Sequence, residues 1–279
     1  MLTKNKYPYI INPKKVGNIM ENKYKRIVIK VGTSSITYPT GKINLGRMEE
    51  LAKIVSDLKN RGYEIVLVSS GAIGAGVGKM GLDDKPVDTK HKQALAAIGQ
   101  ASLVSMYDRF FSNFGYSSAQ VLLTKYVFDD EEKYNNAHNA FEIMFGYGVI
   151  PIVNENDVIS IDEIEVGDND SLSAYVGKMV NADLVVILSD IDGFFDADPT
   201  VNPDAKIIPV IEEIDEKVLS KAGGAGTRRG TGGMITKLNA AKMVMPCGID
   251  MIIANSNDMK KLYDIVDGKQ VGTLFKGKA

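Results

Sequence analysis

Two clusters of acidic and amide side chains are the strongest chemical signal in the sequence. Residues 154–157 (NEND) follow a strongly apolar run, and residues 167–171 (GDNDS) stand where a helix is expected to begin. Asp or Asn at a helix start is an ordinary N-cap, which accounts for one member of the second cluster. Capping does not account for an Asp-Asn-Asp triplet. Carboxylates crowded at one edge require a counter-charge, which a cation, a lysine or a substrate ammonium group can supply.

Two lysines occupy positions that bear on this chemistry. Lys30 stands inside the apolar run 26–31 (RIVIKV), where a lysine is rarely buried without a partner. A side chain that reaches outward from an edge is the alternative interpretation of Lys30. Lys237 falls four residues after Gly233 in an expected helix, where an exposed lysine is the default interpretation.

Three glycine loops sit between expected strands and helices, at residues 30–34 (KVGTS), 69–76 (SSGAIGAG) and 231–234 (TGGM). Glycine allows backbone N–H groups to approach a phosphate closely, and a helix N-terminus favours anions. A single loop of this kind is often only a turn, but three of them favour a polyanionic ligand. The dinucleotide pattern G-x-G-x-x-G is not met, so a dehydrogenase of that type is not supported.

The elements that must position these residues alternate between strands and helices. Short β-branched runs at 26–31, 64–69, 119–124, 149–154, 184–189 and 250–254 predict strands. Amphipathic stretches such as 45–60 and about 90–111 predict helices. Strands that are apolar almost throughout belong in a sheet covered on both faces. The sequence therefore predicts an α/β protein, a three-layer αβα sandwich with an open, mainly parallel central sheet.

The domain organisation follows from the segments that break this alternation. Residues 1–23 show no apolar periodicity and are expected to form a mobile extension, which leaves residues 24–279 as one domain with two functional halves. Residues 158–166 alternate apolar and acidic side chains, so an exposed flap is expected there. The glycine-rich residues 220–233 predict a mobile loop.

Composition excludes several classes of function. The 33 Lys and Arg residues against 35 Asp and Glu residues give a formal net charge of −2, which argues against a nucleic-acid or anionic-membrane binder. No apolar run reaches the roughly 20 residues of a membrane span, and no secretory signal is apparent, so a cytoplasmic protein is expected. One cysteine and two histidines are too few for a disulfide framework or a Cys/His metal centre, and we predict no metal ligands among the side chains.

Together these residues resemble the amino acid kinase family over about residues 24–276. The resemblance is carried by blocks at 28–34 (VIKVGTS), 68–73 (VSSGAI), 153–157 (VNEND), 167–173 (GDNDSLS), 189–199, 230–237 (GTGGMITK) and 271–275 (VGTLF). The NEND and GDND blocks in this order are far more specific than any glycine loop. Many family members carry a PUA domain after the kinase domain, and none is expected within this sequence.

The resemblance implies a fold, a reaction and partners. It implies an open αβα sandwich whose N-terminal half holds L-glutamate and whose C-terminal half holds ATP. The implied reaction is ATP-dependent phosphorylation of the γ-carboxylate of L-glutamate, the first step of proline biosynthesis, with Mg²⁺. It also implies a homo-oligomer, a dimer or a tetramer, with no nucleic acid and no membrane as partner.

The resemblance also implies roles for individual residues. Lys30 and Lys237 would flank the transferred phosphoryl group, and Asp170 would hold both lysines in position. The residues implied to contact glutamate are Ser70, Gly71, Ala72, Asp157 and Asn169. The residues implied to bind ATP are Lys30, Ser189, Asp190, Thr231, Gly232, Gly233, Met234 and Lys237.

The expected chemistry is consistent with these roles. A γ-carboxylate is already ionised at pH 7, so transfer of a phosphoryl group to it needs no general base. The reaction needs two anions positioned together and their charge neutralised, which two lysines, loop N–H groups and a metal ion can supply. Asp157 suits an α-ammonium group, and the turn at residues 70–72 with the Asn169 amide suits an α-carboxylate.

The sequence is also compatible with other functions. A different member of the family, acting on acetylglutamate, aspartate or UMP, would share the lysines and the fold. The NEND block and residues 68–73 argue against these substrates. A catalytically silent sensor of glutamate or nucleotide is a second alternative, and the presence of both lysines and Asp170 argues against it.

Overall fold

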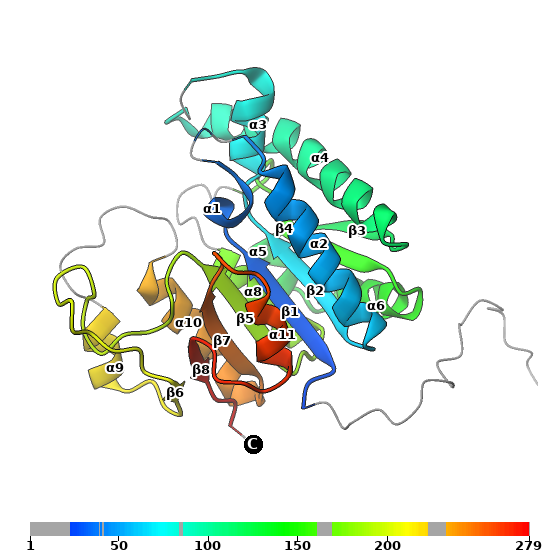
Figure 1. Cartoon of the computed structure of the whole chain (residues 1–279). Coiled ribbons are helices and arrows are strands. Elements are labelled where there is room, and N and C mark those ends of the chain that lie inside the picture. The colour runs from blue at the N-terminus through cyan, green and yellow to red at the C-terminus, as the bar shows by residue number, and fades with distance from the viewer. Residues whose placement is uncertain are drawn as a thin grey trace, which may run out of the picture.

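A computed structural model of the chain describes residues 23–38, 40, 42–83, 86–160, 169–222 and 233–278. In these ranges eight strands form one sheet in the order β3-β4-β2-β1-β5-β7-β8-β6 (Figure 1). Neighbouring strands are parallel except for β7 and β8, which are antiparallel. The strands are β1 (Arg26–Val31), β2 (Glu64–Ser69), β3 (Ser118–Leu123), β4 (Ile150–Glu155), β5 (Leu184–Ser189), β6 (Val210–Ile211), β7 (Asp250–Asn255) and β8 (Thr273–Phe275).

The helices connect these strands in chain order. They are α1 (Thr33–Ile36), α2 (Leu45–Asn60), α3 (Ala72–Met80), α4 (Thr89–Asn113), α5 (Lys125–Asp129), α6 (Glu131–Gly146), α8 (Asn169–Met179), α9 (Glu216–Ala222), α10 (Met234–Val244) and α11 (Lys261–Val266). The three longest have side-chain caps at their first turns, because Asn44, Asp88 and Asp130 accept a hydrogen bond from the backbone N–H three residues later.

Two apolar layers cover the two faces of the sheet. Alternate residues of β1 divide between them: Ile27 and Ile29 pack with helices α2, α4 and α11, and Val28 packs with α6, α8 and α10. This division follows from the period of two along a strand. The predicted three-layer αβα sandwich with a mainly parallel sheet is confirmed (Figure 1).

The predicted strands are all present, and three of the six begin or end one residue from the predicted position. The runs at 119–124 and 149–154 form Ser118–Leu123 and Ile150–Glu155, and the last run continues to Asn255. The helix predicted at about 90–111 is Thr89–Asn113. Strands β6 and β8 were not predicted, because two and three residues are too short for a periodic pattern.

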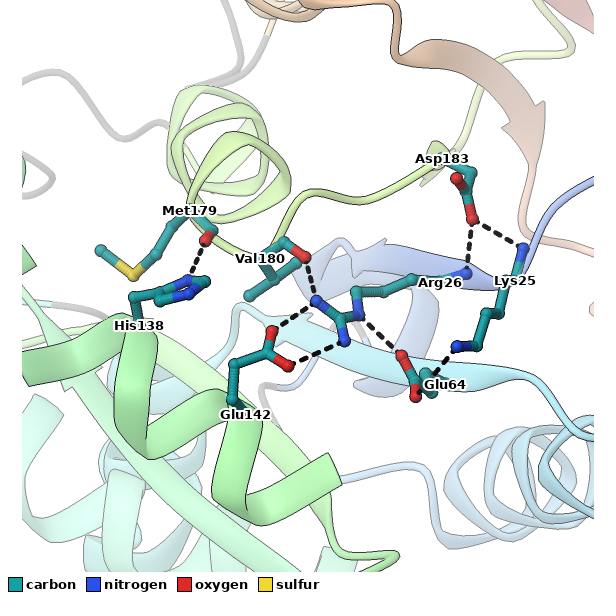
Figure 2. A network of polar contacts seen from close by, with 8 residues as sticks. All are labelled: Lys25, Arg26, Glu64, His138, Glu142, Met179, Val180 and Asp183. Carbon is teal, nitrogen blue, oxygen red and sulfur yellow. Dashed lines mark hydrogen bonds and ion pairs between the residues drawn. The ribbon is translucent and has the colours of Figure 1, made fainter. Parts of the chain in front are cut away.

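An arginine ties several elements together at the edge where the parallel strands begin (Figure 2). The Arg26 guanidinium donates to Glu64 on β2 at 2.8 Å and to Glu142 on α6 at 2.6 Å, and it also donates to the Val180 carbonyl after α8. It lies over the Phe145 ring, 4.2 Å from the centroid. These contacts fix β1 against β2, α6 and α8 from the edge opposite to the strand ends that carry the glycine loops.

Several sequence predictions fall outside the described residues. The predicted extension at 1–23 is described only at Lys23, whose ammonium group lies 2.7 Å from the Asp250 carboxylate. Most of the predicted flap at 158–166 and of the loop at 220–233 also lies outside. None of the helices in the described ranges combines the length and the apolar content that crossing a membrane requires.

Candidate active site

The sheet order places the candidate residues along one edge. In a parallel sheet, ligands bind beyond the carboxyl ends of the strands. Strand β1 lies in the middle of the order, with β2 and β4 on one side and β5 and β7 on the other. The residues expected to contact glutamate follow β2 and β4 or begin α8, and those expected to bind nucleotide follow β5 or lie at the start of α10. Lys30, near the end of β1, lies between the two groups.

The central feature of the site is one carboxylate shared by two lysines. Lys30 Nζ lies 2.8 Å from Asp170 Oδ1, and Lys237 Nζ lies 3.0 Å from Asp170 Oδ2. All three residues are buried, with exposed fractions of 8%, 0% and 3% for Lys30, Asp170 and Lys237. Burial opposes ionisation of Asp170, but the charges and hydrogen bonds of the two lysines outweigh it and lower the pKa of this carboxyl. The lysine at position 237 is therefore not the exposed residue that its helical context favoured.

Local structure explains why these three side chains meet. Lys30 points to the same face of the sheet as Val28, because alternate residues of a strand share a face. Helices α8 and α10 pack on that face, and Asp170 and Lys237 lie in their first turns. Thr236 adds a hydrogen bond from its hydroxyl to Asp170 Oδ2 at 2.9 Å. Two ammonium groups against one carboxylate leave one net positive charge, which suits an anionic phosphoryl group.

On the side of β2 and β4, polar side chains form a connected group. Asn169 Nδ2 donates to the Ser70 hydroxyl at 2.8 Å and to Asn154 Oδ1 at 3.1 Å. Gly71 follows with a φ of 105°, a left-handed conformation that glycine adopts without strain, and α3 begins at Ala72. The Ser70–Ala72 turn and Asn169 are thus brought together as expected. However, both hydrogens of Asn169 Nδ2 are used here, so Asn169 offers its acceptor Oδ1 rather than the donor expected for an α-carboxylate.

Asp157 is the buried carboxylate on this side. It is 6% exposed, and its Oδ1 atom has no hydrogen-bond partner among the described residues. Burial, and after it the negative charge of Glu155, raises the pKa of the Asp157 carboxyl to about 6. A buried carboxylate oxygen without a partner favours a cationic ligand, such as an ammonium group.

The nucleotide side of the site is described in part. The Ser189 hydroxyl, at the end of β5, donates to Asp190 Oδ1 at 3.0 Å, and Asn255 Nδ2 from β7 donates to the Asp190 carbonyl at 3.4 Å. Gly233 is the N-cap of α10, and Met234 is its first residue. The other two predicted members of this loop, Thr231 and Gly232, lie outside the described residues.

The described side chains do not form a magnesium site by themselves. In the ranges that the structure describes, no three His, Cys, Asp or Glu side chains cluster closely enough to hold a metal ion. Both oxygens of Asp170 face ammonium groups. Proteins often bind Mg²⁺ largely through substrate phosphates and water. The magnesium ion therefore stays a prediction.

Some residues of the site were not singled out from the sequence. Gln100 on α4 accepts a hydrogen bond from Asn154, and a helical glutamine carries no distinguishing pattern. Asn154 lies in the NEND block and Thr236 in the 230–237 block, so both were within recognised motifs without an assigned role. Asn255 ends a strand that was predicted to stop one residue earlier.

Similarity to known proteins defines the class of protein to which this site belongs. The chain belongs to the amino acid kinase family, whose sequence model matches residues 25–255. The fold agrees with this: the solved structure of the UMP kinase from Bacillus anthracis superposes on the chain with a TM-score of 0.59 at 18% identity, covering 92% of this chain and 97% of that one.

Within the family, the chain is similar to proteins named glutamate 5-kinase. The glutamate 5-kinase of Clostridium perfringens (strain 13 / Type A) is 53% identical over 258 residues, which cover 91% of this chain and 96% of the relative. That of Thermoanaerobacter sp. (strain X514) is 50% identical over 250 residues, covering 90% of this chain and 67% of the relative. The chain is accordingly a phosphotransferase of the amino acid kinase family.

Proposed function

We propose that this chain transfers the γ-phosphoryl group of ATP to the γ-carboxylate of L-glutamate. The products are L-glutamyl 5-phosphate and ADP, and the reaction is the first step of proline biosynthesis. The observation that carries the proposal is the buried Lys30–Asp170–Lys237 cluster between two groups of ligand-facing residues. The similarity to named glutamate 5-kinases supports the choice of glutamate as acceptor.

The chain's own residues supply what this transfer needs. The γ-carboxylate attacks as an anion, so no side chain has to remove a proton. Two anions must approach each other, and the net positive charge of the Lys30–Asp170–Lys237 cluster offsets their repulsion. Asp170 keeps both ammonium groups fixed before substrate arrives, so little reorganisation is needed during the reaction.

Recognition of glutamate uses its two ends. The α-ammonium group needs acceptors, and Asp157 Oδ1 and Asn169 Oδ1 are buried acceptors without a partner in the described chain. The α-carboxylate needs donors. The Ser70 hydroxyl accepts from Asn169, so its own hydrogen is available to donate, and the N–H groups of Gly71 and Ala72 lie beside it at the start of α3. The γ-carboxylate is then directed toward Lys30.

The remaining assignments belong to the same proposal. ATP binds beyond β5 and at the start of α10, through Ser189, Asp190 and residues 231–237. The part of the chain up to the first residue of α8 holds glutamate, and the part after α8 holds the nucleotide. The protein works in the cytoplasm with Mg²⁺ as a homo-oligomer, and neither nucleic acid nor a membrane is a partner.

The test offers four acceptors separately to the wild-type protein. ADP release is measured with ATP, Mg²⁺ and either L-glutamate, L-aspartate, N-acetylglutamate or UMP, with an acceptor-free reaction as the blank. Hydroxylamine is added to trap an acyl phosphate as the hydroxamate. We expect release and trapping with glutamate far above the other three. Turnover with UMP and not with glutamate would contradict glutamate as the acceptor. Binding of glutamate or ATP without turnover would favour a sensor.

A further inference from the structure

Three buried side-chain amides form a line beside the residues proposed to hold glutamate. Asn169 Nδ2 donates to Asn154 Oδ1 at 3.1 Å, and Asn154 Nδ2 donates to Gln100 Oε1 at 3.0 Å. The exposed fractions are 3% for Asn169, 2% for Asn154 and 7% for Gln100. At the far end of the line, Gln100 Nε2 is buried and has no hydrogen-bond partner among the described residues.

The direction of this line is set at its Asn169 end. Asn169 Nδ2 also lies 3.4 Å from the backbone carbonyl oxygen of Ser69, and a carbonyl oxygen can only accept. Asn169 therefore turns its Nδ2 inward, so Asn154 must present Oδ1 to it and keep Nδ2 for Gln100. Gln100 must in turn present Oε1, because Nε2 in that place would set two donors against each other. The line thus ends in a donor, Gln100 Nε2, that the described part of the chain leaves unused.

Helix packing places Gln100 beside the turn that precedes α3. A Cβ atom on the neighbouring Gly99 would lie 1.8 Å from the carbonyl oxygen of Ala72, the first residue of α3. Helix α4 therefore crosses α3 in close contact at the Ser70–Ala72 turn. The hydrogen bond from Asn154 places Gln100 at the end of β4 as well, and β2 separates β4 from β1, which carries Lys30. Gln100 thus belongs to the side of the site proposed for the α-carbon end of glutamate.

The chemistry of an α-amino acid calls for a donor at this place. Asp157 Oδ1 and Asn169 Oδ1 are buried acceptors without a partner in the described chain, and they suit the ammonium group. The α-carboxylate needs donors instead. Among the buried side-chain atoms of the described residues that have no partner, Gln100 Nε2 is the only nitrogen. A buried donor without a partner is costly, and an anionic ligand that accepts from it recovers this cost.

We propose that Gln100 is a substrate-binding residue whose Nε2 donates to the α-carboxylate of glutamate. The Ser70–Ala72 turn donates to the same carboxylate, while Asp157 and Asn169 accept from the ammonium group. The amide line gives Gln100 this role, because it fixes which end of the Gln100 amide stays unused. The inference rests on the function proposed above, since it concerns the acceptor of that reaction.

The substitution Gln100→Met removes the proposed donor and keeps the length of the side chain. A hydrogen bond to a charged group is lost, so we expect the KM for glutamate to rise roughly tenfold or more. The KM for ATP and kcat should stay close to wild type. Asn154 also loses its acceptor, so Tm should fall by a few degrees. Ala101→Met places the same new side chain on the exposed face of α4 and should change none of these values.

Two substrate analogues separate this contact from a general disturbance of the site. Glutarate keeps both carboxylates of glutamate and lacks the ammonium group, whereas 4-aminobutyrate keeps the ammonium group and lacks the α-carboxylate. Both are measured as competitive inhibitors against glutamate. In Gln100→Met the inhibition constant of glutarate should rise by the same factor as the glutamate KM, and that of 4-aminobutyrate should keep its wild-type value. Asp157→Asn, which removes the charge proposed to face the ammonium group, should show the reverse pattern.

The variant Gln100→Glu keeps the oxygen that Asn154 uses, so it provides a second test if methionine impairs folding. A protonated carboxyl can donate as the amide does and an ionised one cannot, so its glutamate KM should rise relative to wild type as the pH is raised. An unchanged glutamate KM in Gln100→Met, an equal rise in the inhibition constants of both analogues, or a Gln100→Glu variant that follows wild type at every pH would each overturn the inference. Wild-type protein that fails to turn over glutamate would overturn the proposed function instead.

Discussion

Replacement of Lys237 by methionine separates the chemical role of the central cluster from its structural role. Wild-type Lys30, Asp170 and Lys237 carry one net positive charge, and the substitution reduces this to zero. A preorganised charge contact of this kind contributes about 3–4 kcal/mol to the transition state, so we expect kcat to fall by roughly 10²–10³. The variant keeps its volume and its apolar stem, because methionine is an unbranched side chain of similar length.

The same substitution should have little effect on folding. Asp170 retains Lys30 at 2.8 Å and the Thr236 hydroxyl at 2.9 Å, so its carboxylate stays paired. No buried charge is left alone, so the free energy of unfolding should fall by much less than the about 3–5 kcal/mol that an unpaired buried charge costs. Lys242→Met, at an exposed position on the same helix, is the matched control and should behave as wild type.

The assay is steady-state ADP release at saturating glutamate and ATP, with urea unfolding of each variant alongside. A kcat within threefold of wild type would refute the reasoning, because it would mean that the buried ammonium group of Lys237 does not act on the transferred group. A large fall in kcat with an equally large loss of unfolding free energy would also refute it, since the effect would then be structural.

Four further predictions concern the cluster and the residues around it. Asp157→Asn should raise the KM for glutamate much more than the KM for ATP. In the wild-type protein the glutamate KM should rise as the pH falls below about 6, where Asp157 takes up a proton. Steady-state kinetics at several pH values measure both effects, and a glutamate KM that does not change with pH would contradict the protonation of Asp157. Asp170→Asn leaves two buried ammonium groups without a carboxylate, so urea unfolding should show a loss of about 3–5 kcal/mol, and a near-neutral effect would mean that the lysines can reach solvent. Gly99→Ala should lower the free energy of unfolding by about 1–3 kcal/mol, because its methyl group would meet the Ala72 carbonyl oxygen. Gly146→Ala is the control, since a methyl group there would enter open space and should leave the free energy of unfolding unchanged.

The layers of the fold could be predicted because each strand of the sheet carries its own local pattern. Strands β1, β2 and β5 are six-residue apolar runs bounded by turn residues, and their limits were predicted without error. Strands β6 and β8 could not be predicted, since two- and three-residue strands are defined by their partners rather than by their own residues. The one-residue differences at β3, β4 and β7 lie at the ends of strands, which a local pattern defines least well.

The candidate site was also predicted only in part from the sequence. Lys30 and Asp170 were found because a lysine within an apolar strand and an excess of acids at a helix start are both locally unusual. Gln100 was missed because its significance depends on Asn154, which is distant in the chain and close only in the folded protein. The direction of the Asn169 amide could not be predicted either, since it depends on which atoms its neighbours present. Polarity within a hydrogen-bond network is a tertiary property.

Strand β1 pairs with β2 on one side and with β5 on the other, and this affects how the newly made chain assembles. Lys30 is synthesised early, whereas β5, which pairs with β1, and helix α10, which carries Lys237, leave the ribosome much later. A nascent chain that ends before α10 contains Lys30 and lacks Lys237, so the two lysines of the site meet only when most of the domain has been made. The site is therefore assembled late, and the order of the elements along the chain is enough to delay it.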